Sequence, residues 1–241
     1  LGRADLNVIG DRDVVTRAQL RRFADPADRL VWSALTLSEF LTAHVEVAVH
    51  AATILVGGRA VVVTGPPHAG KSTLAANALD LGLPVLGDDH VRIVLAADGV
   101  RVEAFPRPLK LRPRGDRPSA RTLRDGRDGH LDGQPVTLLS RPTVGAGPSI
   151  PVAAVVHLRR RDADGVGVTA VPPSGRPAPL TPQLRGTAIA DGEAAPPARA
   201  ARAALAELPT FSVAVGPDAD VAALRHVVAA VERLAGARSG P

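Results

Sequence analysis

Cysteine, methionine and tyrosine are absent from this sequence, and aromatic residues make up only 2% of its 241 residues. Without cysteine, the chain has no disulfide, no thiolate metal ligand and no cysteine nucleophile. A core with so few aromatic rings must be built mainly from Val, Leu, Ala and Ile. The same shortage disfavours nucleic-acid binding, despite a formal net charge of +5, because bases have almost no rings on which to stack.

The sequence also lacks a secretory signal and a membrane span. Its longest apolar region, residues 45–65, is interrupted by His50, Arg59 and the pair Gly57-Gly58. These breaks, together with abundant β-branched residues, predict short strands instead of a spanning helix. No basic segment followed by an apolar one marks a signal peptide. We therefore expect a cytoplasmic protein with no membrane partner.

Lysine is nearly absent as well: only Lys71 and Lys110 occur among the 29 basic residues, and the others are arginine. Such a bias is typical of GC-rich coding and carries no functional information. The two lysines that remain are therefore informative. Lys71 belongs to a motif in which arginine is a poor substitute, because a compact ammonium must fit between phosphates.

That motif is "GPPHAGKST", residues 65–73, which fits the phosphate-loop pattern G-x-x-x-x-G-K-[ST]. A predicted strand precedes it and a predicted helix follows it, as a phosphate loop requires. We expect the amides of the loop and of the helix N-terminus to hold the phosphates of ATP or another nucleoside triphosphate. The expected contacts are Gly65, His68, Ala69, Gly70, Lys71, Ser72 and Thr73.

Two prolines make this loop unusual. Pro66 and Pro67 have no amide hydrogen, so the phosphate donors must come from His68 to Thr73. Lys71 would neutralise charge on the β- and γ-phosphates, and the hydroxyl of Ser72 would bind Mg²⁺.

A pair of acidic residues, Asp88 and Asp89, follows the apolar residues 85–87. Carboxylates that follow a strand lie at the carboxyl edge of the sheet, where α/β proteins bind their ligands. One of the two could hold Mg²⁺ and the other could deprotonate or position an acceptor. The alternative is an ordinary helix cap or turn.

The remaining pattern predicts an α/β fold, a mixed β-sheet with flanking helices around one phosphate-loop core. We expect a polar segment over residues 1–28 and one domain over residues 29–241. Helices are predicted over 28–43, 71–81, 198–208 and 218–236. Strands are predicted over 45–49, 52–56, 60–64, 83–87, 91–95, 151–161, 166–171 and 210–215, with turns at Gly57-Gly58, Asp98-Gly99 and Asp164-Gly165.

Two tracts rich in proline and glycine interrupt this pattern. Residues 107–148 are expected to form a long surface loop or lid, with a short helix near 119–125, and residues 172–197 to have little regular structure. Between Arg112 and Arg127, six arginines meet only two aspartates. This region would suit an acidic acceptor, and the alternative is a solvated insertion.

The segment "VHAATILVGGRAVVVTGPPHAGKSTLAANALDLGLPVLGDDHVRI" resembles the catalytic domain of the HPr kinase/phosphorylase family. The family has a histidine followed by a small residue, then a hairpin, the phosphate loop and an Asp-Asp pair. His50, the loop and Asp88-Asp89 follow this order. The resemblance covers about residues 45–112, and "AFPRPLKLR" is similar to a segment of relatives encoded beside peptide-tailoring enzymes.

The resemblance implies a phosphate-loop fold of the phosphoenolpyruvate-carboxykinase type, with ATP and Mg²⁺ as cofactors. It implies that Asp88 takes the proton of an acceptor serine and that Asp89 lies close to the metal. It places His50 beside the transferred phosphoryl group. The expected catalytic residues are therefore Asp88, Asp89, His50 and the loop lysine, Lys71. The acceptor would be a serine of a peptide or protein, and a homo-oligomer is an option because the family is often oligomeric.

The chain departs from the family in two respects. We expect no counterpart of the additional N-terminal domain of HPr kinase, and the C-terminal glycine-rich signature is not visible. Phosphorolysis, and HPr as the substrate, are therefore not expected. Arg107 and Lys110 are candidates for clamping the γ-phosphate or an acidic acceptor, and a solvated basic strand edge is the alternative.

Two other functions fit parts of the sequence. One is a nucleotide-binding regulatory ATPase with no phosphoryl acceptor, although no N-K-x-D motif for guanine is present. The other is a kinase of a small molecule such as a nucleoside, with the arginine-rich tract as a lid.

Overall fold

The computed structural model describes residues 5–9, 15–19, 47–88, 91–103, 109–111, 126–131, 134–139, 149–172, 184–185, 189–190, 193–194, 196–217 and 219–238. The helices predicted over 28–43 and 119–125 lie outside these residues. Within them the chain is a mixed α/β protein with a mixed sheet and three helices, which confirms the predicted α/β class with a mixed sheet and flanking helices.

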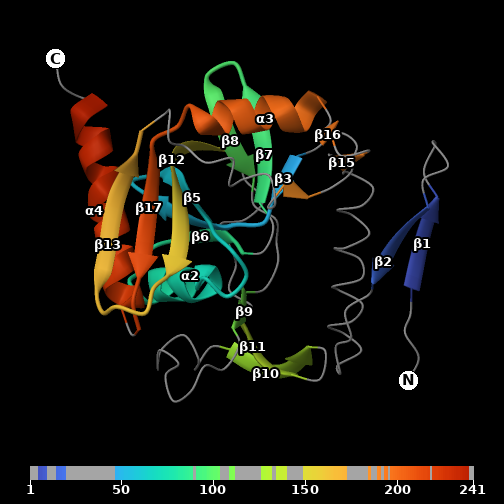
Figure 1. The fold of residues 1–241 in the computed structure, drawn as a ribbon, viewed down its shortest axis with the longest axis horizontal. Helices are drawn as coiled ribbons and strands as arrows, with labels where there is room; N and C mark the ends of the chain where they lie inside the picture. Colours follow the sequence, from blue (N-terminus) through green and yellow to red (C-terminus); the bar gives the residue numbers. More distant parts are fainter. Residues whose placement is uncertain are drawn as a thin grey trace.

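The centre of the fold is a ten-stranded sheet (Figure 1). Its main path runs β14 (Leu184–Arg185), β3 (Val47–Val49), β7 (Val91–Ala96), β8 (Gly99–Glu103), β12 (Ile150–Arg160), β5 (Arg59–Thr64), β4 (Ala52–Val56) and β6 (Val85–Gly87). Off this path, β17 (Thr210–Val215) pairs with β12 and with β13 (Val166–Val171). Strand β12 is parallel to β5 and β17, and the other pairs are antiparallel.

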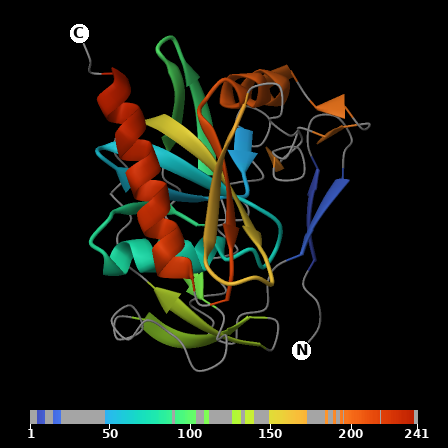
Figure 2. The ribbon, with the colours of Figure 1, turned by 60° about the vertical axis from the view of Figure 1, so that its left-hand side comes forward.

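Helices cover both faces of this sheet. The alternation along β5 divides its side chains between two clusters, since successive residues of a strand point to opposite faces. Val61 and Val63 pack with α2 (Lys71–Asp80) and α4 (Asp220–Arg238), whereas Val62 packs in the cluster that contains α3 (Pro196–Ala206). Figure 2 shows α4 crossing in front of the sheet. Among the described residues, no helix has the length and apolar character needed to cross a membrane.

One predicted turn is confirmed at its residues, and a second chain reversal occurs one residue earlier than the predicted Asp98-Gly99. Val56 pairs with Arg59 across Gly57-Gly58, and both glycines have positive φ, as the favoured two-residue hairpin turn requires. A second hairpin joins β7 and β8 at Ala97-Asp98, where Gly99 opens β8.

The end of α2 also follows the prediction. Gly82 has φ 78°, its N–H donates to the carbonyl of Leu79, and the N–H of Leu83 donates to that of Ala78. These two hydrogen bonds form a Schellman motif, which uses glycine because the residue after the cap is left-handed.

The predicted pairing of residues 166–171 with residues 151–161 is wrong. Strand β13 pairs instead with β17, which lies between β13 and β12. The reason is that β5 and β17 already occupy both edges of β12 near its end. The connection from Asp162 to Gly165 therefore wraps around the end of β17, where the N–H of Gly216 donates to the carbonyl of Gly165.

The surface loop predicted over residues 107–148 contains regular structure. Strand β9 (Leu109–Leu111) pairs with β11 (Gln134–Leu139), which pairs with β10 (Gly126–Leu131). Val136 and Leu138 are buried on one face of β11. The alternation that is typical of a strand is therefore present in this segment, but the surrounding prolines and glycines concealed it in the sequence.

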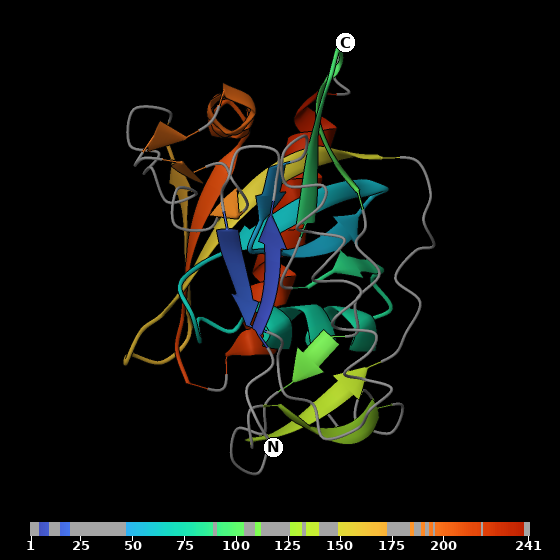
Figure 3. The ribbon, with the colours of Figure 1, turned by 90° about the vertical axis from the view of Figure 1, so that its right-hand side faces the viewer.

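Smaller differences occur elsewhere. Residues 1–28 contain an antiparallel pair, β1 (Asp5–Ile9) and β2 (Val15–Gln19), which faces the viewer in Figure 3. The tract 172–197 contains β14 and the short pair β15 (Ile189–Ala190) and β16 (Glu193–Ala194). Helix α4 passes through Gly236, the predicted end, and continues to Arg238.

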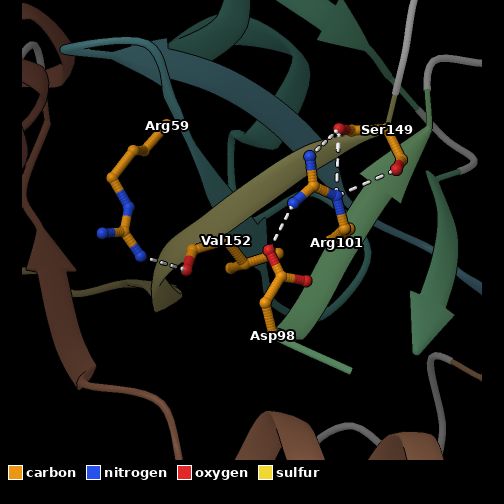
Figure 4. A network of polar contacts seen from close by, with 5 residues as sticks. All are labelled: Arg59, Asp98, Arg101, Ser149 and Val152. Atoms are coloured by element: carbon orange, nitrogen blue, oxygen red, sulfur yellow. Dashed lines mark hydrogen bonds and ion pairs between the residues drawn. The ribbon is translucent and has the colours of Figure 1, made fainter. Parts of the chain in front are cut away.

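The beginning of β12 is fixed to the β7–β8 hairpin by Arg101 (Figure 4). Its Nη2 and Nε donate to the carbonyl of Ser149 at 2.7 and 3.2 Å, and Nε also donates to the Ser149 hydroxyl at 3.0 Å. Its Nη1 forms an ion pair of 2.8 Å with Asp98. On β5, Arg59 donates to the carbonyl of Val152 at 3.2 Å. These bonds fix the start of β12, the strand that joins β8 and its neighbours to the part of the sheet formed by β5 and β17.

Candidate phosphate-binding site

The strand directions bring the predicted site residues to one edge of the sheet. Strand β4 runs antiparallel to both neighbours, so β5 and β6 end at the edge where β4 begins. Gly65 follows β5, Asp88 follows β6, and His50 lies two residues before β4. The sheet thus gathers the phosphate loop, one carboxylate and one histidine from three separate places in the sequence.

Two glycines of the loop lie in close contact with β12. A Cβ on Gly65 would collide with the carbonyl oxygen of Leu158, and a Cβ on Gly70 would collide with the guanidinium of Arg160. Gly70 also has φ 101°, which disfavours any other residue. The loop therefore lies directly against the end of β12.

The first half of the loop is a tight turn. The N–H of Ala69 donates to the carbonyl of Pro66 at 3.2 Å, so this amide is engaged within the loop. His68 is exposed and has φ 64°, the one positive φ outside glycine in the described part of the chain. A non-glycine residue in this conformation stores strain, which is common in ligand-binding loops.

Lys71 is 6% exposed and bends back over the loop. Its Nζ donates to the carbonyls of Gly65 and Pro66 at 2.9 and 3.1 Å. The ammonium is therefore held at the point where the loop leaves β5. Carbonyl oxygens are weaker partners for an ammonium than charged oxygens are, so a phosphate could replace them.

The N-terminus of α2 provides the other half of an anion site. Gly70 caps the helix without a side-chain hydrogen bond, and the first turn contains no acidic residue. The first N–H groups of a helix lack partners within it and carry partial positive charge. Ser72 and Thr73 lie in this turn and are half-buried. Backbone amides, hydroxyls and Lys71 together suit a phosphate.

Asp88 is 3% exposed at the end of β6. Asp89, predicted beside it as a metal ligand, lies outside the described residues, as does Arg107. In the described part of the chain, no three acidic or histidine side chains gather into a protein-only metal site. Mg²⁺ does not need one, since it is usually held by one or two carboxylates together with phosphates. The hydroxyl of Ser72 and a carboxylate of the Asp88-Asp89 pair are oxygen donors of that kind.

The remaining predicted residues lie on either side of the loop in the sequence. His50 is half-buried and directly precedes Ala51, at the sheet edge described above. Lys110 lies on β9, whose Leu109 is buried in the core cluster of α2 and α4. Its role toward a substrate stays a prediction.

Two residues at the site were not predicted. His157 lies opposite Thr64, the last residue of β5, and its Nδ1 is 3.4 Å from the Thr64 hydroxyl. Arg160 lies against Gly70, and its Nη2 forms an ion pair of 2.7 Å with Asp220 in the first turn of α4. Only the parallel pairing of β12 with β5 reveals them, and no motif marks that pairing in the sequence.

Burial lowers the pKa of His157 below its ordinary value, and the positive charges of Arg159 and Lys71 lower it further. His157 is therefore neutral at pH 7. Lys71 belongs to the loop, so His157 lies close enough for a charge in the loop to act on it.

No protein-family model matches this chain, and no curated protein sequence matches it either. Among solved structures, the HPr(Ser) kinase/phosphatase from Coxiella burnetii matches with a TM-score of 0.40 and 14% sequence identity. That match covers 80% of this chain and 99% of the other. A similarity at this TM-score and identity shows neither a family nor an activity for this chain.

Proposed function

We propose that this chain is an ATP- and Mg²⁺-dependent kinase that transfers the γ-phosphate to a hydroxyl group, a serine of a peptide or protein. The observation that supports this most is the position of Asp88. The sheet brings this buried carboxylate to the same edge as the phosphate loop, although helix α2 separates the two in the sequence.

The residues of the site divide the chemistry among them. The amides at the start of α2 hold the phosphates, and Lys71 exchanges its two carbonyl partners for phosphate oxygens. Ser72 and Asp89 would hold Mg²⁺, which neutralises phosphate charge when bound. His50 would lie beside the transferred group.

The transfer itself needs a proton acceptor. The acceptor oxygen forms a bond to the γ-phosphorus while the bond to the bridging oxygen of ADP breaks, and the hydroxyl proton passes to Asp88. Most of the acceleration would come from positioning and charge neutralisation, as is usual for phosphoryl transfer.

The experiment incubates the protein with Mg²⁺, γ-labelled ATP and hydroxyl acceptors: serine peptides, acidic serine peptides and nucleosides. We expect label in a serine peptide. Asp88→Asn should abolish transfer while ATP binding persists, because the loop is intact. Asp98→Asn is the matched control, since this aspartate lies in the β7–β8 hairpin and is paired with Arg101.

Other outcomes would redirect the assignment. If label appears only as inorganic phosphate, and the Asp88→Asn variant releases it as fast as wild type does, the protein is a regulatory ATPase and the kinase proposal is wrong. Label on nucleosides alone would indicate a small-molecule kinase. Thermal unfolding of each variant shows whether a loss of transfer reflects a loss of fold.

A further inference from the structure

His157 lies outside the loop and Asp-Asp motifs, but its hydrogen bonding indicates a role in the site. The Thr64 hydroxyl donates its only hydrogen to the carbonyl of Val156 at 3.1 Å. The contact between Thr64 and Nδ1 of His157 must therefore be donated by the histidine. This arrangement favours the neutral tautomer with the hydrogen on Nδ1, in which Nε2 carries a lone pair.

The groups around His157 explain why it is neutral. Thr64 on β5 and Ser212 on β17 are its uncharged neighbours in register. The charges that act on it are the cations Arg159, on its own strand, and Lys71, in the loop. The negative groups described near this sheet edge are Asp88, on the far side of β4 and β5, and Asp220, which is paired with Arg160. His157 thus lies in a field that disfavours a further positive charge.

A phosphate in the loop reverses this field, because its negative charges lie next to Lys71. We propose that His157 takes up a proton from solvent when a phosphate anion binds in the loop, and that its Nε2–H then donates a hydrogen bond to that anion. This rests on the phosphate-binding part of the proposed function, and extends it by coupling nucleotide affinity to pH. His157 is then a binding residue that is charged only while the ligand is present.

The sign of the coupling follows from the two states. The free protein holds His157 neutral at pH 7, and the complex holds it protonated. Lower pH supplies the proton, so affinity should increase as pH falls toward 6. Each unit by which binding raises the pKa of His157 corresponds to about a tenfold change in affinity between a pH above both pKa values, free and bound, and a pH below both.

The test measures the dissociation constants of ATP and of inorganic pyrophosphate by calorimetry between pH 6 and pH 8. His157→Asn keeps an amide N–H that can donate to Thr64, but it cannot titrate. His226→Asn is the control, because His226 is exposed on α4 and its Nδ1 lies 2.8 Å from the carbonyl of Ala222, one turn earlier on the same helix. Ionisation of the ligands themselves is common to all three proteins and cancels in the ratios.

We expect the ratio of the His157→Asn constant to the wild-type constant to be about tenfold larger at pH 6 than at pH 8. Wild type and His226→Asn should also take up more protons on binding than His157→Asn does, measured in two buffers of different ionisation enthalpy. A ratio that is constant across pH would show a merely structural role and overturn the proposal.

The outcomes separate this inference from the proposed function. If neither ATP nor pyrophosphate binds the wild-type protein, both are wrong. If they bind with equal pH dependence in wild type and His157→Asn, only the histidine proposal is wrong. If they bind as expected and no acceptor is phosphorylated, the histidine proposal stands and the kinase does not.

Discussion

Gly65 has no room for a side chain, because the carbonyl of Leu158 occupies the position that a Cβ would take. We expect Gly65→Ala to destabilise the fold by about 1–3 kcal/mol, since backbone must move to relieve the overlap. Gly57→Ala is the matched control: Gly57 also has positive φ, at 56°, but nothing lies within 4 Å of its Cβ position. Its cost should be only about 1 kcal/mol of conformational strain. Urea unfolding of both variants measures the difference, and equal losses would contradict the packing argument.

Lys71 is the second residue whose replacement is informative. Lys71→Ala removes the ammonium that should contact the phosphates, and we expect ATP binding to weaken by about 2 kcal/mol or more, roughly 30-fold. Lys71→Arg should not restore it, because a planar guanidinium does not fit the space closed by the carbonyls of Gly65 and Pro66. Calorimetric titration with ATP measures both. Full affinity in Lys71→Ala would exclude phosphate binding at this loop.

The lowered pKa of His157 also affects stability. The unfolded chain binds a proton at this histidine near its ordinary pKa of about 6.5, and the folded protein binds it only at lower pH. The unfolded state therefore holds more protons in that window, so stability falls as pH decreases below about 6.5. We expect His157→Asn to lose less of its unfolding free energy than wild type does between pH 7.5 and pH 5.5, in urea unfolding without nucleotide. An equal loss in the two proteins would show that other groups cause the acid sensitivity.

At the scale of elements, Arg160 connects the end of β12 with the starts of two helices. Its guanidinium lies against Gly70, which caps α2, and it is paired with Asp220 in the first turn of α4. The carboxylate also favours the positive end of α4. This bridge places the phosphate loop relative to the helix layer.

We expect Asp220→Asn to destabilise the fold by about 0.5–2 kcal/mol and to weaken ATP binding, because Arg160 is then free to shift away from the loop. The control is Glu103→Gln, which breaks a cross-strand ion pair of 2.9 Å with Arg92 on β7 and β8. It should leave ATP binding unchanged. Measurements of ATP affinity and of urea unfolding separate the two effects, and equal affinity in both variants would contradict the bridge.

At the scale of the whole molecule, β12 holds the sheet together. Its first two residues pair with β8, and its later residues pair with β5 and β17. The two halves of the sheet therefore depend on one strand, and Arg101 fixes the segment where that strand begins.

We expect Arg101→Leu to destabilise the whole domain by about 1–3 kcal/mol, since it leaves the half-buried carbonyl of Ser149 without its donors. Asp98→Asn removes only the exposed end of the network and should cost about 0–1 kcal/mol. Chemical unfolding followed by circular dichroism and by amide exchange gives the test. If Arg101→Leu unfolds only the β7–β8 hairpin, the joining role of β12 is wrong.

The local elements of the fold were predictable because their signals are short-range. The hairpin at Gly57-Gly58 needs two positive φ angles, and α2 ends where Gly82 allows a left-handed residue. The loop motif likewise needs only nearby residues. Strand β11 was missed because its alternation is brief and lies among prolines, and β13 was paired wrongly because proximity in sequence does not show which edges of β12 are occupied.

The sequence by itself determined the phosphate-loop motif, the helix that follows it and the α/β class, because these depend on glycine conformations, periodicity and one lysine within a few residues. The tertiary structure decided which other residues reach that loop. It brought Asp88 to the same sheet edge through strand direction, and His157 and Arg160 through the parallel pairing of β12 with β5. The physical reason is that such pairing is set by the burial of two whole sheet faces, which no single stretch of sequence records.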